Sequence, residues 1–193
     1  MNKNLKLILL AVLFIALIAG ATLLYDTLDD QVDTNQLATQ PSTPTGTEVP
    51  EQEQISAPDF TVLDMDGNER NLSEFIGKPI ILNFWASWCG PCQMEMPDFD
   101  DAYQQYGSEI HFLMVNCTTS SRETIEKAKK LIADKGFTFP VYFDTTGYAS
   151  GTYGAYSIPL TFFIDDEGYV KGYAQGAINR ETLQIGIDRI YTP

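Results

Sequence analysis

The pattern of apolar and polar residues predicts a domain in which β-strands and helices alternate along the chain. Two almost continuous apolar runs, at residues 80–85 and 110–116, are typical of strands buried on both faces of a sheet. Shorter apolar runs predict further strands at residues 57–63, 139–143, 160–165 and 169–173. This order favours an α/β fold with a central mixed β-sheet flanked by helices.

Apolar residues spaced three and four positions apart predict the helices of this domain. The first helix begins at Cys89. The second is expected to open at the capping box of residues 120–123 and to end at Gly136. Asn179 is suited to cap a last helix. The turn signal at residues 66–68 predicts a β-hairpin near the start of the domain.

The chain begins with a segment that is suited to cross a membrane. Residues 7–25 carry no charge and are long enough to span a hydrocarbon core, and the lysines within residues 1–6 place the N-terminus in the cytoplasm. Residues 26–54 are acidic and rich in Pro and Thr, which predicts a disordered tether. The folded domain then occupies residues 55–193 outside the membrane. The alternative is a signal sequence cleaved near residues 19–21, which also exports the domain.

The composition of the chain excludes two classes of protein. A net charge of −14 makes a nucleic-acid partner unexpected. A small scaffold held by disulfides would carry more cysteines than three, and in an even number. One close pair of cysteines and one distant cysteine instead favour redox chemistry.

The close pair lies in the sequence Trp-Cys-Gly-Pro-Cys at residues 88–92. Unpaired N–H groups and the dipole at the start of a helix favour a thiolate, so Cys89 is predicted to be the nucleophile. Cys92 is placed to resolve the mixed disulfide. A zinc half-site is the alternative, but only His111 and Cys117 remain to complete it. We therefore expect no metal and no cofactor beyond a redox-active Cys89–Cys92 disulfide.

Three further residues have simpler alternatives. Glu95 follows Cys92 by three residues on the same helical face; if buried, its pKa would rise and it could exchange protons with Cys92, whereas a solvated helix glutamate is the alternative. Cys117 is interpreted as a buried small hydrophobic residue, with a second redox role if it is exposed. His111 is interpreted as structural.

Two stretches of the chain carry a family resemblance. Residues 83–92, Asn-Phe-Trp-Ala-Ser-Trp-Cys-Gly-Pro-Cys, resemble the thioredoxin active site, and residues 157–162, Ser-Ile-Pro-Leu-Thr-Phe, look like the cis-proline segment of that superfamily. With the anchor, the opening at 57–60 and the stretch 92–97, residues 55–193 are similar to membrane-anchored TlpA/ResA-like thiol-disulfide oxidoreductases. The resemblance implies a thioredoxin-like fold with an N-terminal β-hairpin extension and an inserted helix before the cis-proline.

The resemblance also implies roles for individual residues. Pro159 would be cis and would present the backbone of Ile158 to a substrate peptide, and a trans proline that begins a strand is the alternative. Gly90 and Pro91 would tune the reduction potential, and Trp88 would be an exposed contact for partners. A glutamate at the place of Glu95 is linked to cysteine reactivity in reducing members. Asn83 stands where thioredoxins have a buried aspartate, which makes Glu95 the nearest proton acceptor.

The function implied by the resemblance is reduction of disulfides in exported proteins of a bacterium. Apocytochrome c is the first candidate substrate, in cytochrome c maturation, and a membrane thiol-disulfide protein is the expected electron donor. A monomer is expected. One alternative is an electron donor to an exported peroxidase or methionine sulfoxide reductase. The other is a thioredoxin-like module that docks peptides without catalysis.

Overall fold

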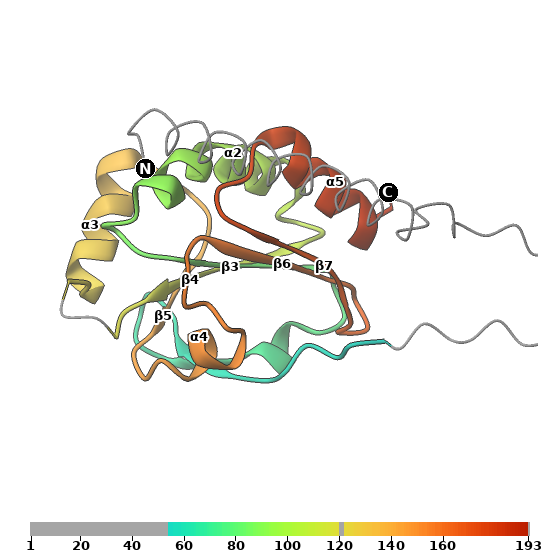
Figure 1. Cartoon of the computed structure of the whole chain (residues 1–193), viewed down its shortest axis with the longest axis horizontal. Helices are drawn as coiled ribbons and strands as arrows, with labels where there is room; N and C mark the ends of the chain where they lie inside the picture. The colour runs from blue at the N-terminus through green and yellow to red at the C-terminus, as the bar shows by residue number, and fades with distance from the viewer. Residues whose placement is uncertain (1–53, 120–121, 193) are drawn as a thin grey trace, which may run out of the picture. The chain divides into compact units, whose positions relative to one another are not determined.

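A computed structural model describes residues 54–119 and 122–192 of the protein. They form a seven-stranded mixed sheet in the order β2-β1-β5-β4-β3-β6-β7, with helices on both faces (Figure 1). The strands are β1 (Thr61–Leu63), β2 (Glu69–Asn71), β3 (Ile80–Trp85), β4 (His111–Cys117), β5 (Val141–Asp144), β6 (Leu160–Ile164) and β7 (Val170–Gln175). The helices are the 3-10 helix η1 (Leu72–Phe75) and the α-helices α2 (Gly90–Tyr106), α3 (Ile125–Lys135), α4 (Tyr148–Thr152) and α5 (Arg180–Ile190).

Strand β3 lies inside the sheet, between β4 and β6, and all six of its residues are buried. It pairs in parallel with β4 and antiparallel with β6, so its apolar residues have helices or loops above and below them. Burial on both faces of the sheet explains the continuous apolar run at residues 80–85. The α/β fold with a mixed sheet is therefore confirmed, as is the hairpin at 66–68, which joins β1 to β2.

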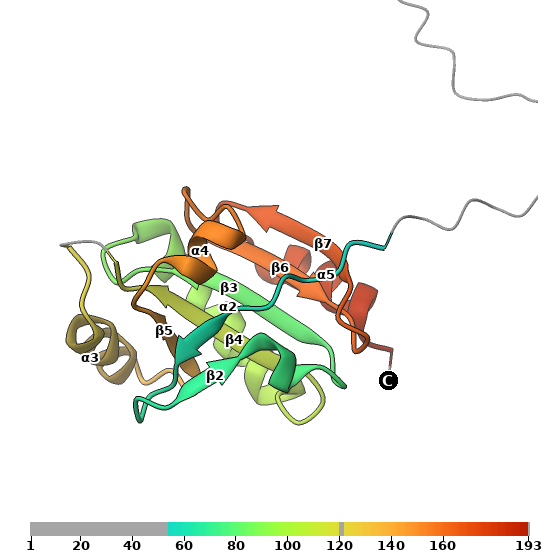
Figure 2. The same cartoon turned by 90° about the horizontal axis from the view of Figure 1, so that it is seen from below.

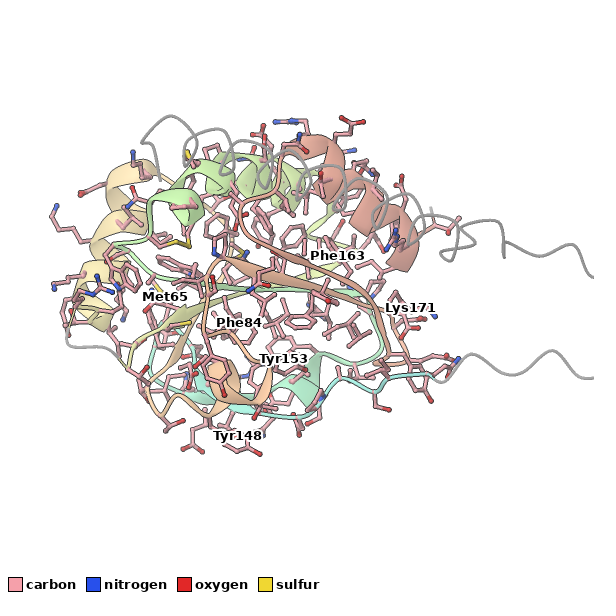
Figure 3. All side chains as sticks on the ribbon, viewed as in Figure 1. Met65, Phe84, Tyr148, Tyr153, Phe163 and Lys171 are labelled. Atoms are coloured by element: carbon pink, nitrogen blue, oxygen red, sulfur yellow. A yellow bond between two sulfur atoms is a disulfide. The ribbon has the colours of Figure 1, made fainter. Side chains whose placement is uncertain are left out.

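Two hydrophobic clusters lie on opposite faces of the sheet. Helices α2, α3 and α5 cover one face, which we call the α2 face, and Phe163 packs there. Helices η1 and α4 and the β1–β2 hairpin cover the other face, which we call the α4 face, and Phe84 packs there. Figure 2 shows the α4 face toward the viewer, and Figure 3 labels both phenylalanines. The cysteine pair belongs to the α2 face.

The structure corrects the predicted start of the second helix. Helix α3 begins at Ile125, and Thr124 caps it by accepting a hydrogen bond from the N–H of Lys127 at 3.2 Å. The capping box predicted at residues 120–123 is wrong, because the carboxylate of Glu123 is buried and bonded elsewhere. The cap of α5 by Asn179 is confirmed. Helix α4 lies before the cis-proline, where the resemblance implies an inserted helix. The apolar pattern gave no sign of it, because it is only five residues long and contains two small residues and a glycine.

The predicted anchor at residues 7–25 and the predicted tether, up to residue 53, lie outside the described residues. Within residues 54–119 and 122–192, no helix has both the length and the apolar character that crossing a membrane requires.

Gly186 provides a test of how closely α5 packs on the sheet. A Cβ atom at this position would lie 2.1 Å from the ring of Phe163. We expect Gly186→Ala to lower the free energy of unfolding by about 1–3 kcal/mol through overpacking, as measured by urea denaturation. Gly151→Ala on α4 is the matched control, because a Cβ there meets nothing within 4 Å. Equal stability of the two variants would contradict the packing described here.

Candidate active site

The two cysteines lie at the junction between β3 and α2. The chain leaves the sheet after Trp85, and Cys89 is the N-cap of α2, with Pro91 in the first turn. Cys89 and Cys92 form a disulfide, and Cys89 Sγ accepts a hydrogen bond from the N–H of Cys92 at 3.2 Å. Cys89 is 4% exposed and Cys92 is fully buried, so Cys89 offers the sulfur that a partner reaches first. When reduced, its thiolate would face the positive end of the helix dipole.

The segment before β6 lies against the outer sulfur. The Ile158–Pro159 peptide bond is cis, as predicted, and Cys89 Sγ lies 3.8 Å from the carbonyl oxygen of Ile158. Ile158 packs against the hydrophobic clusters of both faces, so it occupies the rim between them. The structure thus brings Cys89, Cys92, Ile158 and Pro159 together. Their roles in substrate binding stay predictions.

Glu95 is buried beneath the cysteine pair, which excludes the solvated alternative. Only 2% of the residue is exposed. Its Oε1 accepts a hydrogen bond from Asn83 Nδ2 at 2.9 Å, and its Oε2 accepts one from the N–H of Ile178 at 3.0 Å. Burial raises the pKa of Glu95 to about 7, and these two hydrogen bonds oppose the rise only in part. Near neutral pH the carboxyl group can therefore either give or take a proton.

Asn83 links Glu95 to the strand that follows the cis-proline. Its Nδ2 also donates to Thr161 Oγ1 at 3.0 Å, so one side chain joins β3, α2 and β6. Asn83 is fully buried, and its Oδ1 has no hydrogen-bond partner among the described residues. Because an amide does not titrate near neutral pH, Glu95 is the only group of this buried set that can change its charge there.

A second buried carboxylate fixes the loop before the cysteines. Glu123 Oε2 accepts hydrogen bonds from the N–H of Ser87 at 2.9 Å and from its hydroxyl at 2.7 Å. Its Oε1 accepts one from Asn116 Nδ2 at 3.3 Å. The sequence analysis missed this contact because Glu123 matched a capping box. The signal available was an acidic residue shortly after a buried strand that runs parallel to the one leading to Cys89.

The surface beside the cysteines is aromatic and carries one cation. Trp88 is 43% exposed, and the guanidinium of Arg122 lies 4.0 Å from the centre of its ring. Trp88 therefore has the exposure that a contact for partners requires. Trp85 is fully buried in the core of the α2 face.

Cys117 and His111 lie on β4 and are placed as structural residues. Burial, and secondarily the carboxylates of Asp144 and Glu123, raise the pKa of Cys117 to about 12, so its thiol is a poor nucleophile at neutral pH. The ring of His111 packs edge-on against Phe75 with centroids 5.3 Å apart, and burial lowers its pKa. These positions favour the simpler interpretation of both residues.

The arrangement supports thiol–disulfide exchange between the Cys89–Cys92 pair and a substrate disulfide. In the reduced protein, this geometry lets the Cys89 thiolate attack a disulfide, form a mixed disulfide and release the first substrate thiolate. Cys92, once deprotonated, attacks Cys89 Sγ, restores the Cys89–Cys92 bond and releases the second thiolate. Two electrons pass from the protein dithiol to the substrate disulfide, and the released thiolates take up protons. The reverse sequence oxidises a dithiol.

Known proteins share this fold and this chemistry. The domain is similar to a crystal structure named as the thiol:disulfide interchange protein DsbE of Chlorobium tepidum, with a TM-score of 0.62 and 31% identity over 69% of this chain and 94% of that one. It is also similar to the exposed lipoprotein thioredoxin Etrx1 of Streptococcus pneumoniae, with a TM-score of 0.57 and 32% identity over 68% and 99%. The thiol-disulfide oxidoreductase ResA of Geobacillus thermodenitrificans is 33% identical over 136 residues, 70% of this chain and 76% of that protein.

Geometry and similarity agree that this protein is a thiol-disulfide oxidoreductase with a thioredoxin-like fold. The chain belongs to the AhpC/TSA family, which matches residues 54–173. The predicted relation to ResA-like oxidoreductases is confirmed. Membrane anchoring, which was part of the same prediction, concerns residues that the structure does not describe.

The raised pKa of Glu95 predicts how stability depends on pH. The folded protein holds this proton up to about pH 7, whereas an unfolded chain releases it near the ordinary value of 4.5. The wild-type protein should therefore lose stability as the pH rises through this window, because the folded state binds the extra proton. In Glu95→Gln that loss is absent, so its stability relative to wild type should grow by about 2 kcal/mol between pH 5 and pH 8.

Urea denaturation of the oxidised protein at both pH values measures this difference. Glu109→Gln is the matched control, because this glutamate is exposed in the turn that leads to β4. The control should follow the wild-type pH profile. If Glu95→Gln also followed the wild-type profile, burial would not be raising the pKa of Glu95.

Proposed function

We propose that this protein reduces disulfides in exported polypeptides outside the cytoplasmic membrane. The observation that carries the proposal is the buried Glu95, three residues after Cys92 and with a pKa of about 7. A carboxyl group of this kind accepts the proton that Cys92 must lose before it resolves the mixed disulfide. The direction is supported by Gly90 and Pro91, the pair found in thioredoxin, a reductant with a potential of about −270 mV.

Each residue of the site has one proposed role. Cys89 is the attacking thiolate, Cys92 is the resolving cysteine and Glu95 exchanges protons with Cys92. Ile158, held by the cis bond to Pro159, offers its backbone to an extended substrate segment beside Cys89 Sγ. The remaining substrate contacts are proposed for Trp88, Gly90 and Pro91.

The place of this reaction is proposed from the N-terminal sequence. The apolar segment 7–25 would hold the chain in the membrane, and residues 26–54 would let the domain reach on the order of 30 Å from it. The similarity to an exposed lipoprotein thioredoxin supports an extracytoplasmic location. Electrons would then come from a membrane thiol-disulfide protein.

Apocytochrome c is the substrate that we propose first. Haem attachment to a Cys-x-x-Cys-His site requires two free thiols, which an oxidising compartment would pair. An exported peroxidase or methionine sulfoxide reductase is the other class of acceptor, and it would meet the same active site.

Cysteine variants test the activity. Cys89→Ser should abolish insulin reduction by dithiothreitol-recycled protein, because the attacking sulfur is lost. Cys92→Ser should accumulate a mixed disulfide on Cys89, because no sulfur remains to resolve it. Cys117→Ser is the matched control and should keep wild-type turnover. Equal turnover of Cys89→Ser and wild type would leave only a docking role.

The trapped mixed disulfide also identifies the substrate. Full-length Cys92→Ser expressed in a bacterium that makes c-type cytochromes should capture a polypeptide with a Cys-x-x-Cys-His site. Capture of a peroxidase or a reductase alone would overturn the maturation proposal. A measured reduction potential near −120 mV, typical of the strong oxidant DsbA, would overturn the proposed direction.

A further inference from the structure

A cavity on the α4 face lies beside the strand that follows Pro159. Its volume is about 230 Å³. The residues around it come from the α4–β6 connection and from the neighbouring strands β6 and β7. They are Tyr153, Gly154, Leu160, Phe162, Tyr173 and Gln175.

Three of the six residues that line this cavity are aromatic, and none carries a charge. The ring of Phe162 meets Tyr153 edge-on with centroids 4.9 Å apart, and its centroid lies 5.9 Å from that of Tyr173. Tyr153 is held in place because its hydroxyl donates a hydrogen bond to the carbonyl oxygen of Pro58 at 2.8 Å. Tyr173, by contrast, is 69% exposed. One wall is therefore fixed by the fold, and the other is open to a partner.

The cavity lies within reach of a polypeptide that reacts with Cys89. The reacting sulfur of a substrate must approach Cys89 Sγ, which lies 3.8 Å from the carbonyl oxygen of Ile158. Leu160, which lines the cavity, follows Ile158 by two residues, or roughly 7 Å at the rise of a strand. An extended substrate that lies along Ile158 therefore passes the cavity two to three residues from its cysteine.

We propose that this cavity binds one aromatic side chain of the substrate polypeptide and so contributes to substrate choice. The inference rests on the proposed function and adds a recognition element to it. The volume of about 230 Å³ is below the range of sites for whole small molecules, roughly 300–1,000 Å³, and suits a single ring. Aromatic walls favour an aromatic occupant, because ring edges and faces attract one another.

The test compares two synthetic peptides with one small disulfide. Each peptide carries a single cysteine in mixed disulfide with glutathione; one has phenylalanine two and three residues from it on both sides, and the other has serine there. The small disulfide is 2-hydroxyethyl disulfide, which has no side chain to place in the cavity. The second-order rate constant for oxidation of the reduced protein is measured by quenched thiol trapping. Wild type should react about ten-fold faster with the phenylalanine peptide than with the serine peptide.

Two substitutions then change the cavity. Tyr173→Ala removes the open wall, and Gln175→Trp places a ring in the cavity; each should bring the ratio of the two peptide rates to within about two-fold. Tyr173→Phe should keep the ratio. Tyr148→Ala is the matched control, because Tyr148 is similarly exposed at 62% but lies on the outer side of α4 (Figure 3). All four variants should react with 2-hydroxyethyl disulfide at the wild-type rate.

The outcomes separate this proposal from the proposed function. The aromatic subsite would be overturned if wild type reacted equally fast with the two peptides, or if Tyr173→Ala and Gln175→Trp kept the wild-type ratio of the two peptide rate constants. Either result would leave the exchange reaction intact. If wild type reacted with none of the three disulfides, the proposed reductive function would be overturned instead. A loss of the ratio in Tyr148→Ala as large as in Tyr173→Ala would also contradict the assignment, since the effect would not belong to this cavity.

Discussion

The burial of one carboxyl group, Glu95, is the constraint on which the rest of the site depends. An ionised carboxylate without compensation is costly inside a protein. Two hydrogen bonds offset part of this cost, and the group avoids the rest by keeping its proton up to about pH 7. Those bonds come from Asn83 on β3 and from the backbone of Ile178 just before α5. Segments that are far apart in the sequence therefore meet beneath the cysteine pair, and the proton chemistry of the site relies on the packing of the sheet against α2 and α5.

The sequence specified the elements whose signals are local or strongly patterned. The runs at 80–85 and 110–116 correspond to the buried strands β3 and β4, because a strand buried on both faces needs consecutive apolar residues. The predicted helix start at the cysteine pair was also found, with Cys89 as the N-cap of α2. The resemblance supplied the cis-proline and the helix inserted before it. Two features left no signal in the pattern of residues. Helix α4 is too short to show a period, and Glu123 reaches Ser87 across the fold, which no spacing along the chain reveals. The sequence left open whether Glu95 is buried or solvated, because its position on the helix is compatible with both.

In the proposed function, the two faces of the sheet carry different parts of the work. The α2 face holds the disulfide, Glu95 and the residues that fix them, and Trp88 and the two residues between the cysteines are exposed beside them. The α4 face offers an aromatic cavity and exposed tyrosines. Ile158 packs against the hydrophobic clusters of both faces, so in the proposed function the segment before β6 joins the reacting sulfur to the surface that binds substrate. Changes of specificity could therefore accumulate on the α4 face without disturbing the buried carboxyl group.

The remaining thiol has a consequence for the fidelity of the redox cycle. Every turnover passes through a mixed disulfide, and a third reactive sulfur in the same domain could capture it and leave a non-productive cross-link. With its pKa raised to about 12, Cys117 is ionised at pH 7 in only on the order of one molecule in 10⁵. Such a sulfur competes poorly with Cys92 for attack on the mixed disulfide. Its low ionisation therefore slows disulfide scrambling, whatever the distance between the thiols. Desolvation of Cys117 thus limits the part that this third thiol takes in exchange reactions.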